Sequence, residues 1–339
     1  MTKRFVNFNL YLAICICLIS LGLAGPAAAY DEKNPMVLKV AIDNPKADMK
    51  SQTIYKLAEL VGERTKGRVE FKFFHGASLI KKPQFVDGVA RGIADISTGP
   101  ISFVTGKIPD LSPFEVYGAY RLDKFLEMSK AVSPLLAELF AKHGIHPLFI
   151  QYSGSVVFAD KTKFLKTPAD WAGQKMRLAG RWQSTLAKNW GASPVFMAPG
   201  DLYVALQRGV IDGYMLIWDI VYGLKLQEVA PFIIDSGFSN NIEVVTMNLK
   251  KWEELTDEDK KIFRDAVEEI LPWTYEATLK YYAEIQQKII DQGGKIYKLT
   301  PEEKTLYLKD SHALLPEVRK ASGEMGGKFL DILEPFRDQ

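Results

Sequence analysis

Short apolar runs alternate with amphipathic segments along most of the chain. Residues 37–42 form an apolar run that ends in an Asp-Asn-Pro turn, as a buried strand often does. Over residues 51–66 the apolar positions recur every three or four residues, the spacing of a helix with one buried face. Residues 69–73 alternate between apolar and charged side chains, which is typical of a strand. This order predicts an α/β fold with a mostly parallel sheet and helices on its faces.

The middle of the chain repeats the same alternation. We predict strands over residues 145–152, 193–197 and 211–216, and a helix over residues 201–209. The Ser-Gly-Ser sequence at 153–155 follows the first of these strands and loosens the chain there, so we place a crossing between two lobes at this point. The second half is therefore expected to form an α/β lobe of its own.

The C-terminal part of the chain has a strongly helical pattern. A helix is predicted to begin after Thr256 and to run to about Gly293, with Pro272 kinking or dividing it. The Thr-Pro-Glu-Glu sequence at 300–303 combines a capping residue with a proline at the first helical position and predicts the start of another helix. Long helices are therefore expected to complete the fold.

The N-terminal segment differs from the rest of the chain. Lys3 and Arg4 precede an apolar run that extends to Leu23, and the small residues 27–29 follow it. This pattern predicts a secretory signal peptide over residues 1–29, cleaved at its end. A membrane anchor is the alternative, but no basic cluster follows the apolar run to stop its transfer. We therefore expect an exported mature protein.

The charge balance and the cysteine positions exclude several functional classes. The chain has 43 lysines and arginines against 41 acidic residues, so removal of Lys3 and Arg4 would leave a balanced mature chain. Such a chain gives no reason to expect binding to nucleic acid or to an anionic membrane surface. Both cysteines, Cys15 and Cys17, lie in the predicted signal peptide. The mature chain is therefore expected to have no disulfide, thiol nucleophile or cysteine metal site.

No familiar catalytic motif is present in the sequence. The chain lacks a glycine-rich phosphate loop, a G-x-S-x-G elbow and an H-E-x-x-H zinc motif. His143 and His146 form a close pair across a predicted helix end, and a zinc site would need a further ligand nearby. We therefore expect no metal, no cofactor and a binding protein rather than an enzyme. An exported enzyme is the alternative, and it would need catalytic groups that converge on a cleft.

One arginine stands where the pattern favours an apolar residue. Arg177 lies between Met176 and Leu178 in the sequence AGQKMRLAG, which otherwise has the pattern of a short buried strand. A guanidinium remains protonated and presents its donors in a planar fork that fits a carboxylate. Because a buried unpaired charge is unfavourable, Arg177 needs an anionic partner. That partner is either an Asp or Glu of the chain itself or the carboxylate of a ligand.

Several segments in a fixed order resemble one protein family. They read DGVARGIADIS from Asp87, GQKMRLAG from Gly173 and WGASPVFMAPGDLYVALQRGVIDG from Trp190. In this order and spacing they are similar to the solute-binding proteins of TRAP transporters, the DctP-like family. Residues 57–80 and the helical C-terminal region continue the likeness, which therefore extends over nearly the whole mature chain.

The resemblance implies a fold and a role. The fold would be a two-lobed α/β periplasmic binding protein of type II, a Venus flytrap with hinge-crossing strands and long C-terminal helices. Lobe I would comprise residues 30–152 and about 243–280, and lobe II residues 153–242 and about 281–339. The protein would capture a small organic acid in the periplasm and deliver it to the membrane permease subunits of a TRAP transporter. It would not itself span the membrane after signal cleavage.

The resemblance also implies a ligand-binding site. Arg177 falls on the family's signature arginine, which pairs with the substrate carboxylate. Polar or aromatic contacts of the sugar-acid and dicarboxylate binders are replaced here by Val156, Pro199 and the pair Met215 and Leu216. We therefore expect a monocarboxylate with an apolar or aromatic body. A C4-dicarboxylate or a keto acid is the alternative ligand.

Further candidate contacts are aromatic or polar residues near the predicted cleft segments. The full set of candidate ligand-binding residues is Arg177, Trp218, Tyr152, Phe103, Tyr214, Trp182, Arg181, Asn44 and Met215. For each aromatic residue, packing in the core is the equal alternative. Arg181 is either a second anion contact or a surface residue at a helix start, and Asn44 is either a polar contact or a turn former.

Overall fold

The computed structural model describes residues 30–338. The predicted signal peptide, residues 1–29, lies outside the described residues. Among the residues described, no helix combines the length and the apolar character that a membrane crossing requires.

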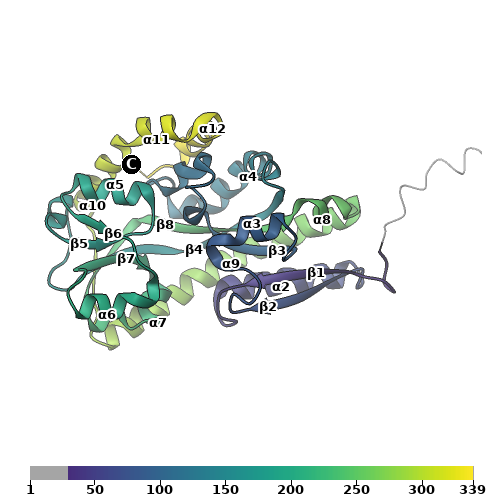
Figure 1. The fold of residues 1–339 in the computed structure, drawn as a ribbon, viewed down its shortest axis with the longest axis horizontal. Helices are drawn as coiled ribbons and strands as arrows, with labels where there is room; N and C mark the ends of the chain where they lie inside the picture. Colours follow the sequence, from purple (N-terminus) through teal and green to yellow (C-terminus); the bar gives the residue numbers. More distant parts are fainter. Residues whose placement is uncertain (1–29, 339) are drawn as a thin grey trace, which may run out of the picture.

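One mixed sheet of nine strands runs through the whole molecule (Figure 1). Its order is β2-β1-β3-β8-β4-β7-β5-β6, and β9 pairs with β8. The strands are β1 (Met36–Ile42), β2 (Val69–His75), β3 (Ile96–Pro100), β4 (Ile145–Asp160), β5 (Lys175–Arg177), β6 (Ser193–Val195), β7 (Gly213–Ile217), β8 (Phe232–Asn248) and β9 (Lys295–Lys298). β1 to β3 form a parallel group in lobe I, and β5 to β7 form another in lobe II. Antiparallel pairing of β8 with β3 and β4, and of β4 with β7, joins the two groups.

The long strands β4 and β8 connect the lobes. β8 pairs with β3 of lobe I near one end, and β4 pairs with β7 of lobe II near the opposite end. Their mutual register shifts between Tyr152 and Gly154 and again between Ser155 and Val157. Gly154 has a φ of +115°, and a Cβ at this position would lie 2.7 Å from the ring of Tyr282. Only glycine fits this irregular point without strain.

Local patterns locate most of these strands, but not β8. The strand predicted over 145–152 continues to Asp160, because the Ser-Gly-Ser sequence forms the irregular point within β4 rather than its end. Residues 232–248 show little alternation because most of them are buried on both faces of the sheet. The pair Asn240 and Asn241 in the middle of this segment also has the composition of a turn.

Helices pack around the sheet in both lobes (Figure 1). The α-helices are α2 (Met49–Arg64), α3 (Phe85–Ala90), α4 (Phe125–Ala141), α5 (Arg181–Asn189), α6 (Leu202–Gln207), α7 (Trp218–Gly223), α8 (Leu249–Glu254), α9 (Asp257–Asp291), α10 (Pro301–Ala313), α11 (Leu315–Ala321) and α12 (Gly323–Leu333). The short 3-10 helices are η1 (Lys82–Gln84), η2 (Ile101–Phe103), η3 (Pro109–Glu115), η4 (Leu122–Lys124), η5 (Pro168–Trp171), η6 (Pro199–Asp201), η7 (Leu226–Glu228) and η8 (Glu334–Phe336). The capping box at Thr300 begins α10, in agreement with the prediction.

The helix α9 is 35 residues long and contacts both lobes. It begins after Thr256 as predicted, where the Thr256 side chain accepts a hydrogen bond from the Asp259 amide at 3.1 Å. Pro272 does not divide the helix, which is continuous through this position. A proline inside a helix is unfavourable by about 3 kcal/mol. Burial of Phe263 in lobe I and of Ile289 in lobe II anchors the helix on both sides of the proline and offsets this cost.

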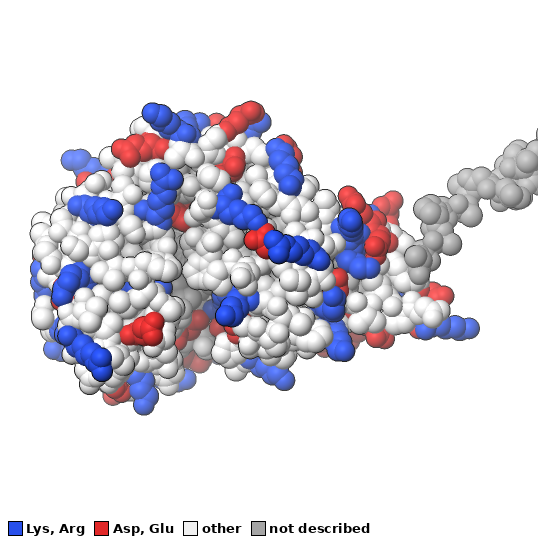
Figure 2. All heavy atoms as spheres, in the orientation of Figure 1, with Lys and Arg blue, Asp and Glu red and all other residues white. Residues whose placement is uncertain are grey.

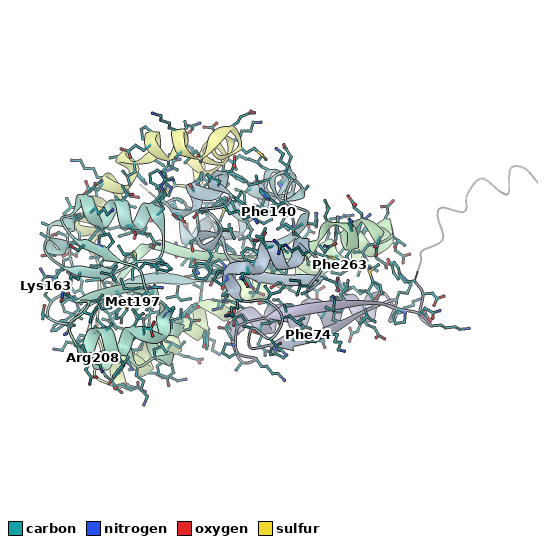
Figure 3. The ribbon with its side chains drawn as sticks, in the orientation of Figure 1. Phe74, Phe140, Lys163, Met197, Arg208 and Phe263 are labelled. Carbon is teal, nitrogen blue, oxygen red and sulfur yellow. The ribbon has the colours of Figure 1, made fainter. Side chains whose placement is uncertain are left out.

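The apolar core consists of two clusters, which Figure 3 locates by Phe263 and Phe140. The cluster around Phe263 includes residues of β1, α2 and α9, whereas the cluster around Phe140 extends from α4 into lobe II. The predicted limits assign residues 281–339 to lobe II. However, α12 packs on α4 and η3, which the same limits assign to lobe I. The residue limits of the lobes therefore remain a prediction.

Candidate functional site

A cavity of about 120 Å³ lies between the two lobes. Lobe I contributes residues of β3, η1 and η2, and lobe II contributes residues of β5, β7, α5 and α7. The lining residues are Lys82, Pro100, Ser102, Phe103, Val156, Arg177, Ala179, Gln183, Pro199, Met215, Leu216, Ile217, Ile220, Asn241 and Glu243. In Figure 2 the surface is indented between the lobes, and basic and acidic side chains are interspersed on this face. Most lining residues are apolar, so a few polar groups determine how a ligand can be oriented.

Arg177 reaches the cavity from the end of β5. This strand lies between β6 and β7 and runs parallel to both, so its carboxyl end opens where ligands bind in such sheets. Met176 and Leu178 on either side are buried in the core. Nε of Arg177 donates to the carbonyl oxygen of Met197 at 3.1 Å, and Nη1 donates to that of Met215 at 3.2 Å (Met197 is labelled in Figure 3). The two carbonyls hold the guanidinium in place without neutralising its charge.

The charge of Arg177 has no internal counterion among the residues described. Its side chain forms no salt bridge with a described carboxylate, and Nη2 donates to no described residue. Arg177 is 5 % exposed. Burial lowers the pKa of Arg177 to about 10, which leaves the guanidinium charged at neutral pH. The sequence leaves two kinds of partner open for Arg177. One of them, an Asp or Glu of the chain itself, is not found among residues 30–338.

A second charged group lines the cavity from lobe I. Nζ of Lys82 lies 2.9 Å from Oε1 of Glu243 and also donates to Oδ1 of Asn44. Glu243 lies on β8 and is 1 % exposed. Its Oε2 accepts a hydrogen bond from Oγ1 of Thr98 at 3.2 Å. The ammonium of Lys82 is therefore paired within the protein, unlike the guanidinium of Arg177.

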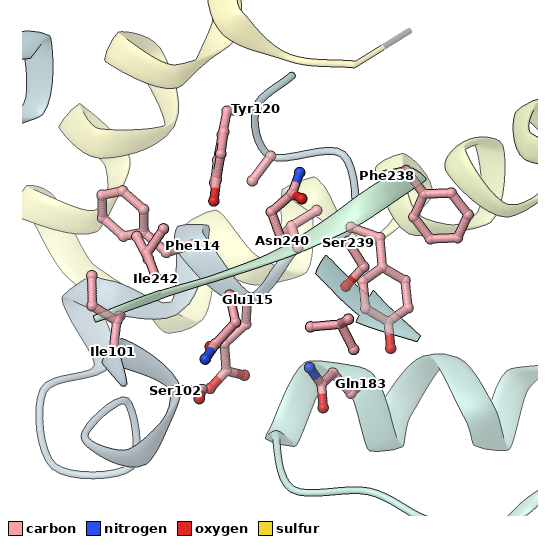
Figure 4. Close-up of a pocket in the computed structure, with 15 residues that line it drawn as sticks. Ile101, Ser102, Phe114, Glu115, Tyr120, Gln183, Phe238, Ser239, Asn240 and Ile242 are labelled. Atoms are coloured by element: carbon pink, nitrogen blue, oxygen red, sulfur yellow. The ribbon is translucent and has the colours of Figure 1, made fainter. Parts of the chain in front are cut away.

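A void of about 30 Å³ with a mixed polar and apolar lining adjoins the cavity and shares Ser102, Val156, Gln183 and Asn241 with it. Figure 4 shows Glu115 of η3 and Gln183 of α5 beside this void. Burial raises the pKa of Glu115, although hydrogen bonds from Thr105 and from the Trp182 amide oppose the shift. A void of this volume has room for about one or two water molecules rather than for an organic ligand.

A buried ion cluster joins the lobes beside the cavity. Nζ of Lys50 in α2 lies 2.8 Å from Asp219 of α7 and 3.1 Å from Asp48. Asp48 and Asp219 line a larger pocket of about 730 Å³, which shares Pro199 and Ile220 with the cavity. Burial disfavours the charged form of Lys50, but the neighbouring carboxylates outweigh this effect and its pKa is raised. The cluster therefore provides a paired electrostatic contact between lobe I and lobe II.

The sequence profile of one known family covers most of this fold. The profile of the bacterial extracellular solute-binding proteins, family 7 (DctP), matches residues 40–320. The chain belongs to this family. The resemblance to the solute-binding proteins of TRAP transporters is thereby confirmed, and the family is one of transport proteins rather than enzymes.

Relatives of this DctP-family protein are named for different small acids. The 2,3-diketo-L-gulonate-binding periplasmic protein YiaO of Escherichia coli is 26% identical over 296 residues, 86% of this chain and 85% of the relative. The C4-dicarboxylate-binding periplasmic protein DctP of Vibrio cholerae is 24% identical over 312 residues, 90% of this chain and 92% of the relative. A solved structure of a Bordetella pertussis extracytoplasmic solute receptor binding pyroglutamic acid has a TM-score of 0.78 at 20% identity, and the match covers 88% of this chain and 99% of that chain. The likeness confirms the two-lobed fold.

The apolar wall of the cavity includes the positions that we interpret from the sequence as departures from the family's pattern. Val156, Pro199, Met215 and Leu216 all line the cavity. Phe103 lines it from lobe I and is 41 % exposed, so one ring is available to a ligand. Two of the predicted contacts, Phe103 and Met215, thus lie in the same cavity as Arg177.

Four predicted aromatic contacts lie outside the lining of this cavity. The hydroxyl group of Tyr152 is hydrogen-bonded to Oγ of Ser155 at 2.8 Å, and its ring is buried. Tyr214, Trp182 and Trp218 are also buried, and their polar ring atoms have no partner among the residues described. The structure places these four rings in the packing around the cavity, which is the alternative that the sequence left open.

The last two predicted contacts also lie behind or beside the cavity. Arg181 is exposed at the start of α5, with its guanidinium carbon 5.1 Å from the centre of the Trp182 ring, and it does not line the cavity. Asn44 is buried and holds Lys82, and its Nδ2 donates to Asp48 at 3.2 Å. Asn44 therefore supports a lining residue rather than forming the wall itself.

Sequence reasoning missed five polar residues of the lining: Lys82, Ser102, Gln183, Asn241 and Glu243. Glu243 stands alone in the apolar sequence IEVVTM, which is the same signal that singled out Arg177. Lys82 follows another lysine in a loop, a pattern typical of solvated side chains, so its sequence context contained no useful signal.

Proposed function

We propose that this protein is the periplasmic binding component of a TRAP transporter and captures a small monocarboxylate with an apolar body. The observation that supports this proposal is Arg177, a buried cation that faces the cavity and has no carboxylate partner among the residues described. A ligand carboxylate would accept the N–H groups that the two backbone carbonyls leave free. Such a charge-assisted contact contributes about 1.5–3 kcal/mol and also orients the ligand.

The size and lining of the cavity support a small ligand with an apolar body. Its volume of about 120 Å³ is small beside the roughly 300–1,000 Å³ of pockets for drug-sized ligands. Phe103, Val156 and Leu216 offer apolar surface rather than hydrogen bonds to most of a ligand. The Bordetella pertussis receptor is named for pyroglutamic acid, a compact ring with one carboxyl group, which agrees with the proposed small size and single carboxylate.

A C4-dicarboxylate or a keto acid is the second candidate. The Vibrio cholerae and Escherichia coli relatives are named for such ligands, and Lys82 supplies a second cation in the cavity. However, Lys82 is already paired with Glu243. A second ligand carboxylate would therefore enter beside an existing buried carboxylate, which disfavours this candidate.

The transport role includes delivery of the ligand to TRAP permease subunits. The family match and the predicted signal peptide support a periplasmic location. Mass spectrometry of the protein from a periplasmic extract should find the mature N-terminus at Tyr30. A full-length chain in the cytoplasm would contradict the proposed location.

Calorimetric titration of residues 30–339 tests the ligand class. We expect butyrate, benzoate or pyroglutamate to bind more tightly than succinate or malate, each at neutral pH. Tighter binding of succinate or malate would favour the second candidate, and no binding of any acid would contradict the carboxylate anchor. Conversion of any of these acids by substoichiometric protein, followed by NMR, would instead identify an enzyme.

A further inference from the structure

We infer that Lys82 is a specificity-determining residue, and that its pair with Glu243 selects a monoanion carrying a neutral hydrogen-bond acceptor on the side facing lobe I. This inference rests on the proposed function, because it takes Arg177 as the anchor for the single carboxylate. It adds a second polar contact from the opposite lobe.

The pair is rigidly supported inside lobe I. Glu243 is 1 % exposed, and it accepts hydrogen bonds from Thr98 at 3.2 Å and from Ser153 at 3.4 Å in addition to its contact with Lys82. Asn44 holds the same ammonium group from another side. The position of the Lys82 nitrogen is therefore determined before any ligand arrives.

Lys82 retains the capacity to bind a ligand. Its Nζ bonds to Glu243 and to Asn44, which leaves an N–H group for a further acceptor. The side chain is 20 % exposed and lines the cavity that Arg177 lines from lobe II. A ligand held by its carboxylate at Arg177 can therefore accept a hydrogen bond from Lys82 through a hydroxyl or carbonyl oxygen.

The charges that line the cavity favour a single negative charge. Lys82 and Arg177 are cations, Glu243 is an anion, and the lining residues of the described chain include no other Lys, Arg, Asp or Glu. The lining thus has one excess positive charge, which one carboxylate neutralises. A dicarboxylate would leave an uncompensated negative charge in a poorly solvated cavity, which is unfavourable.

Lys82 could alternatively serve only to neutralise Glu243. The two roles predict different selectivity. A Lys82 that donates a hydrogen bond to the ligand favours ligands with an oxygen atom at that point, whereas a Lys82 that only neutralises Glu243 does not. Three acids of four carbons separate the effects: butyrate, 3-hydroxybutyrate and succinate. They differ by a neutral oxygen or by a second carboxylate on a similar chain.

The experiment measures the affinity of the three acids for four proteins by calorimetric titration. The proteins are the mature wild type, Lys82→Met, Glu243→Gln and the double variant Lys82→Met/Glu243→Gln. The double variant is the matched control, because it keeps the net charge of the wild-type cavity while it removes the ammonium donor and replaces the Glu243 carboxylate by a neutral amide. Circular dichroism and thermal melting check the fold of each protein.

We expect wild type to prefer 3-hydroxybutyrate to butyrate by about tenfold and to bind succinate weakly. The double variant should lose the preference for the hydroxyl group, so that its affinities for butyrate and 3-hydroxybutyrate become similar. Glu243→Gln, which adds a net positive charge, should bind succinate about tenfold more tightly than wild type does.

A hydroxyl preference that survives in the double variant would overturn the contact with Lys82. An unchanged succinate affinity in folded Glu243→Gln would overturn the charge selection. If Lys82→Met is unstable because Glu243 loses its partner, the double variant still decides the donor role. By contrast, no binding of any of the three acids to wild type would count against the Arg177 anchor and hence against the proposed function itself.

Discussion

The two walls of the cavity each present one cation, but the cations are paired differently. On the lobe I wall, Lys82 is bonded to Glu243 and Asn44. On the lobe II wall, Arg177 is held by two neutral carbonyl groups. A cation with an internal carboxylate is stable without a ligand, whereas a buried cation without one gains its counterion only when a ligand binds. This difference is why we propose Arg177 as the anchor and Lys82 as a selector.

Lys50 extends the comparison to a third buried cation. It lies between Asp48 and Asp219 at the contact of the lobes and does not line the ligand cavity. Changes at Lys50 are therefore expected to alter stability, whereas changes at Arg177 are expected to alter binding.

The largest expected effect follows from Arg177→Ala. Loss of the carboxylate anchor should weaken binding of butyrate by about 100-fold, since a charge-assisted hydrogen-bonded pair contributes up to about 3 kcal/mol. The melting temperature of the unliganded protein should change little, because removal of a buried charge without an internal counterion offsets the loss of the hydrogen bonds to Met197 and Met215. Calorimetry and thermal melting measure the two quantities. Arg181→Ala is the matched control, because Arg181 lies in the same segment but outside the cavity, and this variant should bind butyrate normally. An equal loss of affinity in both variants would refute the anchor role.

A smaller effect, on stability, is expected from Lys50→Met. This change leaves Asp48 and Asp219 near one another with no cation between them, and we expect the free energy of unfolding to fall by about 2 kcal/mol. This loss of stability is smaller than the loss expected when a fully buried ion pair is broken, because Asp219 is 14 % exposed. Urea denaturation measures the change, and Lys50→Met/Asp219→Asn should recover part of it. An unchanged urea midpoint in Lys50→Met would show that the cluster does not stabilise the fold.

A third prediction concerns the pH dependence of stability and involves a residue of lobe I remote from the cavity lining. His146 stacks on Trp252 with ring centres 4.0 Å apart. Burial, assisted by the positive charges of Arg264 and Lys260, lowers the pKa of His146 to about 4. In the unfolded chain a histidine titrates near about 6.5.

As the pH falls from 7 towards 5, the unfolded chain therefore binds a proton that folded His146 does not. The free energy of unfolding should decrease, by about 1 kcal/mol at pH 5.5. His146→Phe keeps an aromatic ring and removes the titration, so its stability should change less over this range. Urea denaturation at several pH values measures both proteins, and identical slopes would rule out His146 as the cause. Arg177 remains charged throughout this range, so any change in binding should follow protonation of the ligand carboxylate.

The smallest expected effect is that of Asn44→Ala. Because Asn44 holds Lys82 and does not line the cavity, its removal should weaken binding of 3-hydroxybutyrate by only about threefold and leave butyrate unaffected. Parallel calorimetric titrations of the two acids measure the ratio. A similar loss for both acids would instead favour the direct contact that the sequence suggested for Asn44.

The parts of the fold that could be predicted from the sequence are those with local causes. A capping threonine begins α9 and another begins α10, because each satisfies backbone groups within one turn of itself. β8 could not be predicted, because burial on both faces removes the alternation that identifies a strand. The same loss of local signal explains why the aromatic candidates could not be divided between core and cavity.

Three features could be inferred from the sequence: the α/β alternation, the family and the conflict at Arg177, a charge in an apolar strand. These features depend on periodicity, motif order and the chemistry of a single side chain. The tertiary structure alone decided which charged groups meet. Lys82 reaches Glu243 because η1 packs against β3, and β3 pairs with β8, a strand far later in the chain. Ion pairing depends on distances between remote segments, and no local pattern encodes those distances.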